Sequence, residues 1–295
     1  MFNLPSHIYW KLDGKVNANY DSISNTDIPN FEFAYINDIN QPATTKYASA
    51  INNRLIALNQ AGKSKLAIFI SGKDSEIIAI QCKKLGIDFE LYFLNIVGIN
   101  EYMLTNANLV ALTLGSHLNV ISLTLADAMS YSESSYELSK VLKPTYLVVP
   151  YMFDKIPFDQ HIIIGEGDLN KGGKSYELLI HPDPGVGIPI LNTEIAYLLH
   201  GRKLDRDGDY YFHSSSLELI KTVWHHPLLL KNYPNFSNQK IIDSEWGSNL
   251  IFKSKTTNWD SNAGIQLNLK IRNHLAIKYK TKFNILSTII PKETL

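Results

Sequence analysis

Short apolar runs alternate with amphipathic patterns through the middle of the chain. The apolar runs are nearly continuous, as expected for strands buried on both faces of a sheet, and they cover residues 65–70, 88–96, 118–125 and 161–168. Helical spacing of apolar residues fills the intervals at 74–85, 101–115 and 127–142. Strands and helices that alternate in steps of roughly 30 residues are typical of βαβ units. We therefore predict an α/β fold with a Rossmann-like parallel sheet and helices on both faces.

The two ends of the chain carry different patterns. Residues 31–39 alternate between apolar and polar like a strand, and residues 43–60 have helical spacing. Residues 144–153 fit either a strand or a helix, and the pattern becomes more helical from about residue 190. We therefore expect an N-terminal strand-and-loop segment, a sheet domain and a mainly helical C-terminal layer, over residues 1–42, 43–190 and 191–295.

Composition removes several classes of function. The chain has 295 residues, 45% of them hydrophobic, which is enough for a sizeable core. Its 28 basic and 28 acidic residues balance, so a wholly basic nucleic-acid binder is not expected. The single cysteine, Cys82, excludes a disulfide framework and paired-cysteine zinc or redox sites, and it falls in a helical apolar pattern that predicts a core position. No signal peptide or membrane span is recognisable, which predicts a cytoplasmic protein.

Two polar turns follow strands of the predicted sheet. Ser71-Gly72-Lys73-Asp74-Ser75 comes directly after the first central strand, and Gly165-Glu166-Gly167-Asp168 comes after the last. In an open parallel sheet, ligands bind outside the carboxyl ends of the strands, where the strand order reverses. These turns are therefore the candidate chemical sites.

The first turn has the composition of a phosphate cradle. Gly72 lets backbone amides approach an anion, and a helix that begins near Asp74 directs its positive end to the same place. Lys73 adds a cation, and the two serines add hydroxyl donors. Asp74 would repel phosphate unless Mg²⁺ lay between them, so the turn suggests magnesium-bridged pyrophosphate. The alternative is a plain strand–turn–helix junction with Asp74 or Ser75 as the N-cap.

Both turns lie in segments that resemble one family. "FISGKDSEIIA" resembles the SGGxDS pyrophosphate loop of the PP-loop, or N-type, ATP pyrophosphatases. "IIIGEGDLNK" is similar to the GEGADE segment of the asparagine synthetase branch, and "GIPILNTEIAYLL" loosely resembles a helix entry of that branch. The resemblance covers roughly residues 45–200. It implies a HUP-type sheet that binds ATP and Mg²⁺ and releases AMP and pyrophosphate.

The resemblance also implies roles for individual residues. An adenylating ligase would activate an acceptor with ATP, and an amine or ammonia would displace AMP. The chain has no room for a glutaminase of its own and has Phe2 where that domain needs cysteine. Catalytic roles fall to Lys73, Asp74, Glu166 and Asp168. Metal binding falls to Asp74 and Asp168. Nucleotide binding falls to Ser71, Gly72, Lys73, Asp74, Ser75, Asn95, Gly165 and Gly167.

Two other functions remain open at this stage. The first turn is one glycine shorter than the family loop, as expected of a degenerate nucleotide-binding module with little or no turnover. Residues 261–292 contain no acidic residue, so the segment 270–292 offers a possible nucleic-acid contact, as in a nucleic-acid-modifying enzyme. The alternative for this segment is a solvated face. Its basic residues are Lys270, Arg272, Lys278, Lys280, Lys282 and Lys292.

Three further features invite a chemical interpretation. Asn95 and Asn100 follow the second central strand, where the superfamily reads adenine or holds substrate; ordinary loop capping is the alternative. His225 and His226 are adjacent, so they point to different faces, and a solvated or packing role is favoured over a shared metal. Residues 201–213 are rich in Asp but lack the order of a calcium loop, which predicts a turn.

Overall fold

The computed structural model describes most of the chain between residues 42 and 252 and parts of both ends. The described residues are 8–12, 15–17, 31–35, 42–62, 64–139, 147–166, 197, 200–201, 203–206, 208–228, 238–252, 267, 270–271, 273–275 and 277–278.

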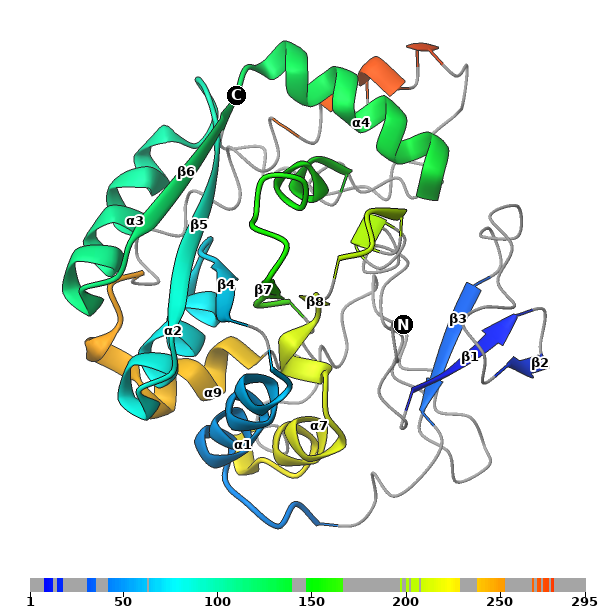
Figure 1. Ribbon diagram of the computed structural model, residues 1–295. Helices are drawn as coiled ribbons and strands as arrows, with labels where there is room; N and C mark the ends of the chain where they lie inside the picture. Colours follow the sequence, from blue (N-terminus) through cyan, green and yellow to red (C-terminus); the bar gives the residue numbers. More distant parts are fainter. Residues whose placement is uncertain are drawn as a thin grey trace, which may run out of the picture.

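A five-stranded parallel sheet forms the centre of the molecule (Figure 1). Its strands are β4 (Lys65–Phe69), β5 (Phe89–Ile96), β6 (Leu118–Leu123), β7 (Gln160–Ile164) and β8 (Gly208–Asp209). They lie in the order β6-β5-β4-β7-β8, and every neighbouring pair is parallel. The predicted parallel α/β sheet is confirmed.

Helices cover both faces of this sheet. They are α1 (Tyr47–Gln60), α2 (Lys73–Leu85), α3 (Glu101–Leu114), α4 (Leu125–Ser139), α7 (Leu217–Trp224) and α9 (Asn238–Glu245). Helix α2 packs against α1, α3 and α9, and α1 packs against α7. The chain runs from β4 to the β6 edge and then returns to β7 on the other side of β4. Since such crossovers are right-handed, α4 lies across the sheet from α2 (Figure 1).

A second, smaller sheet precedes this unit. Strands β1 (Ile8–Leu12), β2 (Lys15–Asn17) and β3 (Phe31–Tyr35) pair antiparallel in the order β2-β1-β3. The alternating pattern at 31–39 predicts a strand, and its described part, Phe31–Tyr35, forms β3.

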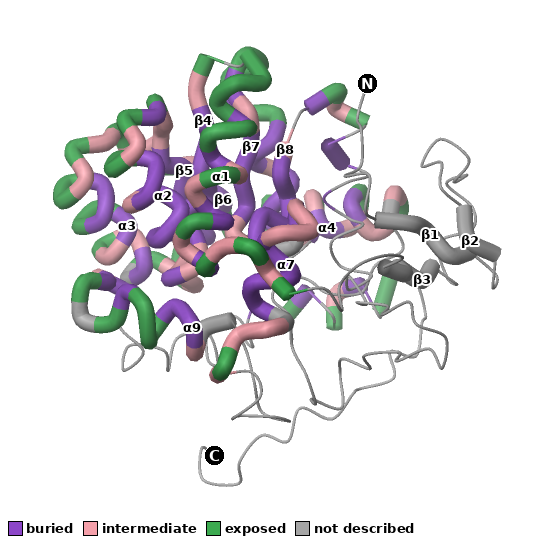
Figure 2. The backbone as a smooth tube through the Cα atoms, turned by 90° about the horizontal axis from the view of Figure 1, so that it is seen from below, coloured by how far each residue is buried: buried purple, intermediate pink, exposed green. Residues whose placement is uncertain are grey.

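The core lies between the five-stranded sheet and its helices. The central strands are buried along most of their length (Figure 2). Ile68 and Ile163 have no exposed surface, and each such side chain contributes roughly 1.5–3 kcal/mol through burial. Cys82 is also fully buried, and burial raises the pKa of its thiol to about 12. This confirms the core position predicted for Cys82.

The structure decides one assignment that the sequence left open and corrects another. The described part of residues 144–153 is helical and includes the 3₁₀ turn η3 (Val149–Met152). Residues 201–213 were predicted as a turn, but Gly208–Asp209 form the edge strand β8. A long-range ion pair accounts for the difference: the carboxylate of Asp209, 4% exposed, binds the guanidinium of Arg54 at 2.8 Å.

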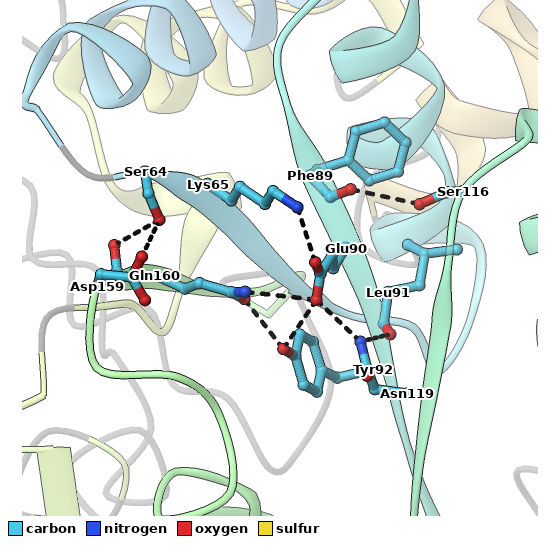
Figure 3. Close-up of polar contacts among 10 residues, drawn as sticks. All are labelled: Ser64, Lys65, Phe89, Glu90, Leu91, Tyr92, Ser116, Asn119, Asp159 and Gln160. Carbon is cyan, nitrogen blue, oxygen red and sulfur yellow. Dashed lines mark hydrogen bonds and ion pairs between the residues drawn. The ribbon is translucent and has the colours of Figure 1, made fainter.

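The amino ends of the strands are joined by a polar network around Glu90 (Figure 3). Its carboxylate accepts hydrogen bonds from Lys65 (2.9 Å), Asn119 (3.1 Å), Tyr92 (3.2 Å) and Gln160 (3.3 Å). The Lys65 ammonium is the main reason why the pKa of Glu90 is lowered to about 2. The network ties four neighbouring strands together at the end of the sheet opposite the two candidate turns.

Candidate functional site

The two candidate turns lie side by side at the switch point of the sheet. Strands β4 and β7 are hydrogen-bonded neighbours, with Phe69 opposite Ile164. The chain leaves β4 towards one edge and later returns to β7 on the other side, so the strand order reverses between them. The turn after β4 and the turn after β7 therefore emerge at the same carboxyl edge. This is the position where open parallel sheets bind ligands.

The turns are in backbone contact. A Cβ atom added to Gly165 would lie 2.8 Å from the backbone nitrogen of Ser75 and 3.1 Å from the carbonyl carbon of Asp74. Real Cβ atoms essentially never approach another atom within 3.0 Å. Glycine at position 165 therefore allows the second turn to approach the start of α2 closely.

The first turn begins α2 in a way that the sequence did not predict. The helix begins at Lys73 with Gly72 as N-cap, not at Asp74 with Asp74 or Ser75 as N-cap. The hydroxyl of Ser75 accepts hydrogen bonds from the amides of Ser71 (3.0 Å) and Gly72 (3.2 Å), and it donates one to the carbonyl of Gly72 (2.9 Å). This serine thus satisfies two amides that were expected to face an anion.

The start of α2 offers space beside this turn. The first amides of an α-helix have no acceptor within the helix, and this end of a helix favours anions. A Cβ atom at Gly72 would meet no atom of the described residues within 4 Å. Asp74, in the first turn of α2, is half-buried. The binding of a magnesium-bound phosphate chain by this turn, with Asp74 as a carboxylate ligand, remains a prediction.

Two other side chains of α2 bind the C-terminal part of the chain. The buried ammonium of Lys73 forms an ion pair with Asp243 of α9. The carboxylate of Glu76, 1% exposed, accepts hydrogen bonds from the amides of Ile251 (2.6 Å) and Phe252 (2.9 Å). Burial raises the pKa of Glu76, although both amides and Lys73 oppose the shift. The role of Lys73 towards pyrophosphate remains a prediction.

His213 connects the two turns, and sequence reasoning missed it. Its backbone amide donates to the carbonyl of Glu166 (3.0 Å), and its Nε2 lies 3.4 Å from the carbonyl of Asp74. Its Nδ1 lies 2.6 Å from the hydroxyl of Tyr47. Burial lowers the pKa of His213 to about 4. No local motif marks this histidine, because its partners are far away in the sequence.

Of the two predicted asparagines, Asn95 lies within β5, near its carboxyl end, and only Asn100 follows the strand. Asn100 stabilises its own loop, since its Oδ1 accepts from the Ile96 amide (2.6 Å) and its Nδ2 donates to the Leu94 carbonyl (2.8 Å). Loop capping therefore accounts for Asn100. Asn95 is 8% exposed and donates from Nδ2 to Ser122 (3.3 Å). Its buried Oδ1 has no partner in the described part of the chain, so it is an open acceptor near the carboxyl edge.

The remaining predicted ligands are only partly described. Gly167 and Asp168 lie outside the described residues, and their roles stay predictions. Within the described ranges, no group of three His, Cys, Asp or Glu side chains is arranged to hold a metal ion. Nδ1 of His226 accepts from the Leu228 amide (3.2 Å), and Nε2 lies 3.7 Å from Glu245, as expected for a packing role.

The basic C-terminal segment is described only between residues 267 and 278. Leu267, Ile271 and Leu275 are buried at helical spacing. His274 lies 2.5 Å from a carboxylate oxygen of Glu133, and Lys278 forms an ion pair with the same carboxylate. The described part thus packs on α4, and nucleic-acid binding by residues 270–292 stays a prediction. Among the described helices, none is long and apolar enough to cross a membrane.

Comparison with known proteins found no matching family model and no matching curated protein. Among solved structures, the chain is similar to an NMN synthetase from Francisella tularensis, with 13% identity, a TM-score of 0.33, and coverage of 82% of this chain and 98% of that one. It is also similar to an NH3-dependent NAD synthetase from Campylobacter jejuni in complex with nitrate, with 13% identity, a TM-score of 0.31, and coverage of 85% and 100%. Likenesses this distant carry no argument about chemistry.

Proposed function

We propose that this chain is an ATP-dependent adenylating ligase of the PP-loop kind, which forms AMP and pyrophosphate and joins an amine or ammonia to an activated acceptor. The observation that carries the proposal is the backbone contact between the Ser71–Ser75 turn and Gly165 at the switch point. Two turns that resemble the ATP-binding segments of one superfamily thus lie where a single nucleotide can contact both. The asparagine synthetase-like branch remains the nearest resemblance in sequence.

Different residues of the site would bind different parts of the nucleotide. Amides at the start of α2 would bind the pyrophosphate part, and the open space beside Gly72 would admit it. Asp74, together with the predicted ligand Asp168, would hold Mg²⁺, which neutralises charge on the phosphates when bound. The open Oδ1 of Asn95 would accept a hydrogen bond from the exocyclic amine of adenine.

Catalysis in such a site is mainly electrostatic. Phosphate-transferring sites position the reacting groups and stabilise the charge that develops on the leaving pyrophosphate. Glu166 stays the predicted orienting carboxylate of the second turn. Lys73 is the predicted cation, and its ammonium would have to exchange Asp243 for a phosphate oxygen to fulfil that role.

The proposal is tested by nucleotide binding and turnover in the same preparation. Calorimetry with ATP and Mg²⁺ should give a saturable signal. In the presence of ammonium and a suitable acceptor, a pyrophosphate assay should detect the pyrophosphate that is released together with AMP. Asp74→Asn should lower turnover at least 100-fold while leaving the thermal unfolding transition in place. Asp88→Asn is the matched control, because Asp88 is an exposed carboxylate at the opposite edge of the sheet. Absence of any ATP signal in the wild-type protein would refute the proposal.

A second candidate is a nucleotide-binding module without turnover. It is favoured by the Ser75 hydroxyl, which occupies the amides of Ser71 and Gly72. The same measurements separate the two functions. A module would bind ATP with no AMP formed under any acceptor, and Asp74→Asn would then change only the affinity for MgATP.

A further inference from the structure

We propose that His213 is a positioning residue of the nucleotide site, whose backbone amide and imidazole set the spacing and orientation of the two turns through their backbones. The inference rests on the proposed function, because the proposed ATP site gives the two turns a shared ligand. It concerns a residue that belongs to neither turn and to none of the motifs that suggested ATP.

The geometry brings three elements together at one residue. His213 lies in the 3₁₀ turn η4 (Phe212–Ser214), which follows β8. Its amide donates to the Glu166 carbonyl in the second turn at 3.0 Å. Its ring reaches the Asp74 carbonyl at the start of α2 at 3.4 Å, and the Tyr47 hydroxyl at the start of α1 at 2.6 Å. Movement of either turn relative to the other would therefore stretch a bond to His213.

The partners determine which ring nitrogen carries the proton. The carbonyl oxygen of Asp74 can only accept, so Nε2 must donate to it. Nδ1 of the neutral ring is then an acceptor, and the Tyr47 hydroxyl donates to it. Tyr47 is itself fixed, since it is 1% exposed and its ring meets the edge of Trp246 at 6.2 Å between centroids. The Asp74 carbonyl thus sets the tautomer, and the Tyr47 hydroxyl holds the other ring nitrogen.

The bond acts on the peptide group that the second turn contacts. The carbonyl of Asp74 and the amide of Ser75 belong to one planar peptide unit. His213 binds this unit at its oxygen, and Gly165 lies against its nitrogen. The unit cannot rotate without losing one of these contacts, so the amides at the start of α2 keep their direction. Positional errors of about 1 Å in a site of this kind reduce rates on the order of 100-fold.

Burial encloses the imidazole. His213 has no exposed surface, and its ring contacts Tyr47 and Asp74, so it can exchange partners only if the surrounding elements move. A ring enclosed in this way suits a positioning role and not proton transfer to a substrate.

Two substitutions, each of which keeps one of the two hydrogen bonds of the ring, separate the bond to Asp74 from the bond to Tyr47. In His213→Gln, the terminal amide nitrogen takes the place of Nε2 and still donates to Asp74. In His213→Asn, the shorter side chain places its oxygen near Nδ1, so it accepts from Tyr47 but does not reach Asp74. We expect His213→Gln to keep the wild-type kcat/KM for ATP within about threefold. We expect His213→Asn to lose about 10- to 100-fold, with amide hydrogen exchange accelerated in residues 71–78.

The outcome is decided by comparing the variants at equal folded fraction. The same loss of kcat/KM and the same exchange rates in both variants would show a merely structural role and overturn the inference. Nitrogen NMR of the wild-type protein supplies a readout that needs no ATP: protonation of Nδ1 instead of Nε2 would also overturn it. If the wild-type protein does not bind MgATP, the proposed function fails, while the exchange and NMR measurements still decide whether His213 holds the turns.

Discussion

The contact between the two turns can be tested with a pair of glycine substitutions. Gly165→Ala adds one methyl group that would lie 2.8 Å from the backbone nitrogen of Ser75. Ordinary contact begins at 3.4 Å, so the turns must separate by roughly 0.6 Å. The obstacle is backbone, which cannot rotate aside as a side chain can. Overpacking of this kind costs about 1–3 kcal/mol.

Gly72→Ala is the matched control for stability. The added methyl group would meet no described atom within 4 Å, and the φ angle of 178° is one that alanine adopts freely. Alanine also reduces the conformational freedom of the unfolded chain, which offsets its weaker N-cap propensity. We therefore expect stability within about 1 kcal/mol of the wild type. The same methyl group should nevertheless weaken MgATP binding, because it projects into the space where the pyrophosphate would lie.

Urea unfolding and calorimetry measure the two effects separately. Gly165→Ala should shift the unfolding midpoint with an unchanged m-value, and it should weaken MgATP binding through the displaced turn. Gly72→Ala should weaken MgATP binding alone. Wild-type stability in Gly165→Ala would refute the close contact between the turns, and wild-type affinity in Gly72→Ala would refute the position assigned to the phosphates.

Three further predictions follow from the buried charges around α2 and from the buried histidines. Glu76→Gln should destabilise the protein by roughly 1–3 kcal/mol in urea unfolding, because one of the two backbone amides loses its carboxylate acceptor; an unchanged midpoint would contradict this. Asp243→Asn should release Lys73 and strengthen MgATP binding several-fold in calorimetry; equal or weaker binding would show that Lys73 does not serve the phosphates. Burial lowers the pKa values of His213 and His200 from 6.5 to about 4, so the unfolded chain binds more protons and stability falls as the pH drops through this range. Each histidine should lower the free energy of unfolding at pH 5 by about 2 kcal/mol. The loss of stability between pH 8 and pH 5, measured by thermal unfolding, should therefore be smaller in His213→Gln.

The sequence predicted those parts of the fold that depend on local patterns. Continuous apolar runs identified β4 and β7, and the chemistry of the turns after them indicated the switch point. Strand β8 was missed because Gly208–Asp209 has no apolar run, and it is held by neighbours distant in the sequence. The ion pair of Lys73 and the position of His213 were missed for the same reason. Both depend on partners more than 130 residues away, and no local periodicity reports such contacts.

The attachment of α2 to the end of the chain has a consequence for how the protein is made. Lys73 and Glu76 are buried by residues 243 and 251–252. A ribosome would have produced the loop and its helix long before those partners emerged. Until then a lysine and a glutamate would stay hydrated on the surface of the nascent helix, and removing them from water without partners is unfavourable. A fragment that stops before residue 238 should therefore keep the loop sequence and still lack the contacts that hold α2, so the chain up to residue 252 is needed to build the first turn.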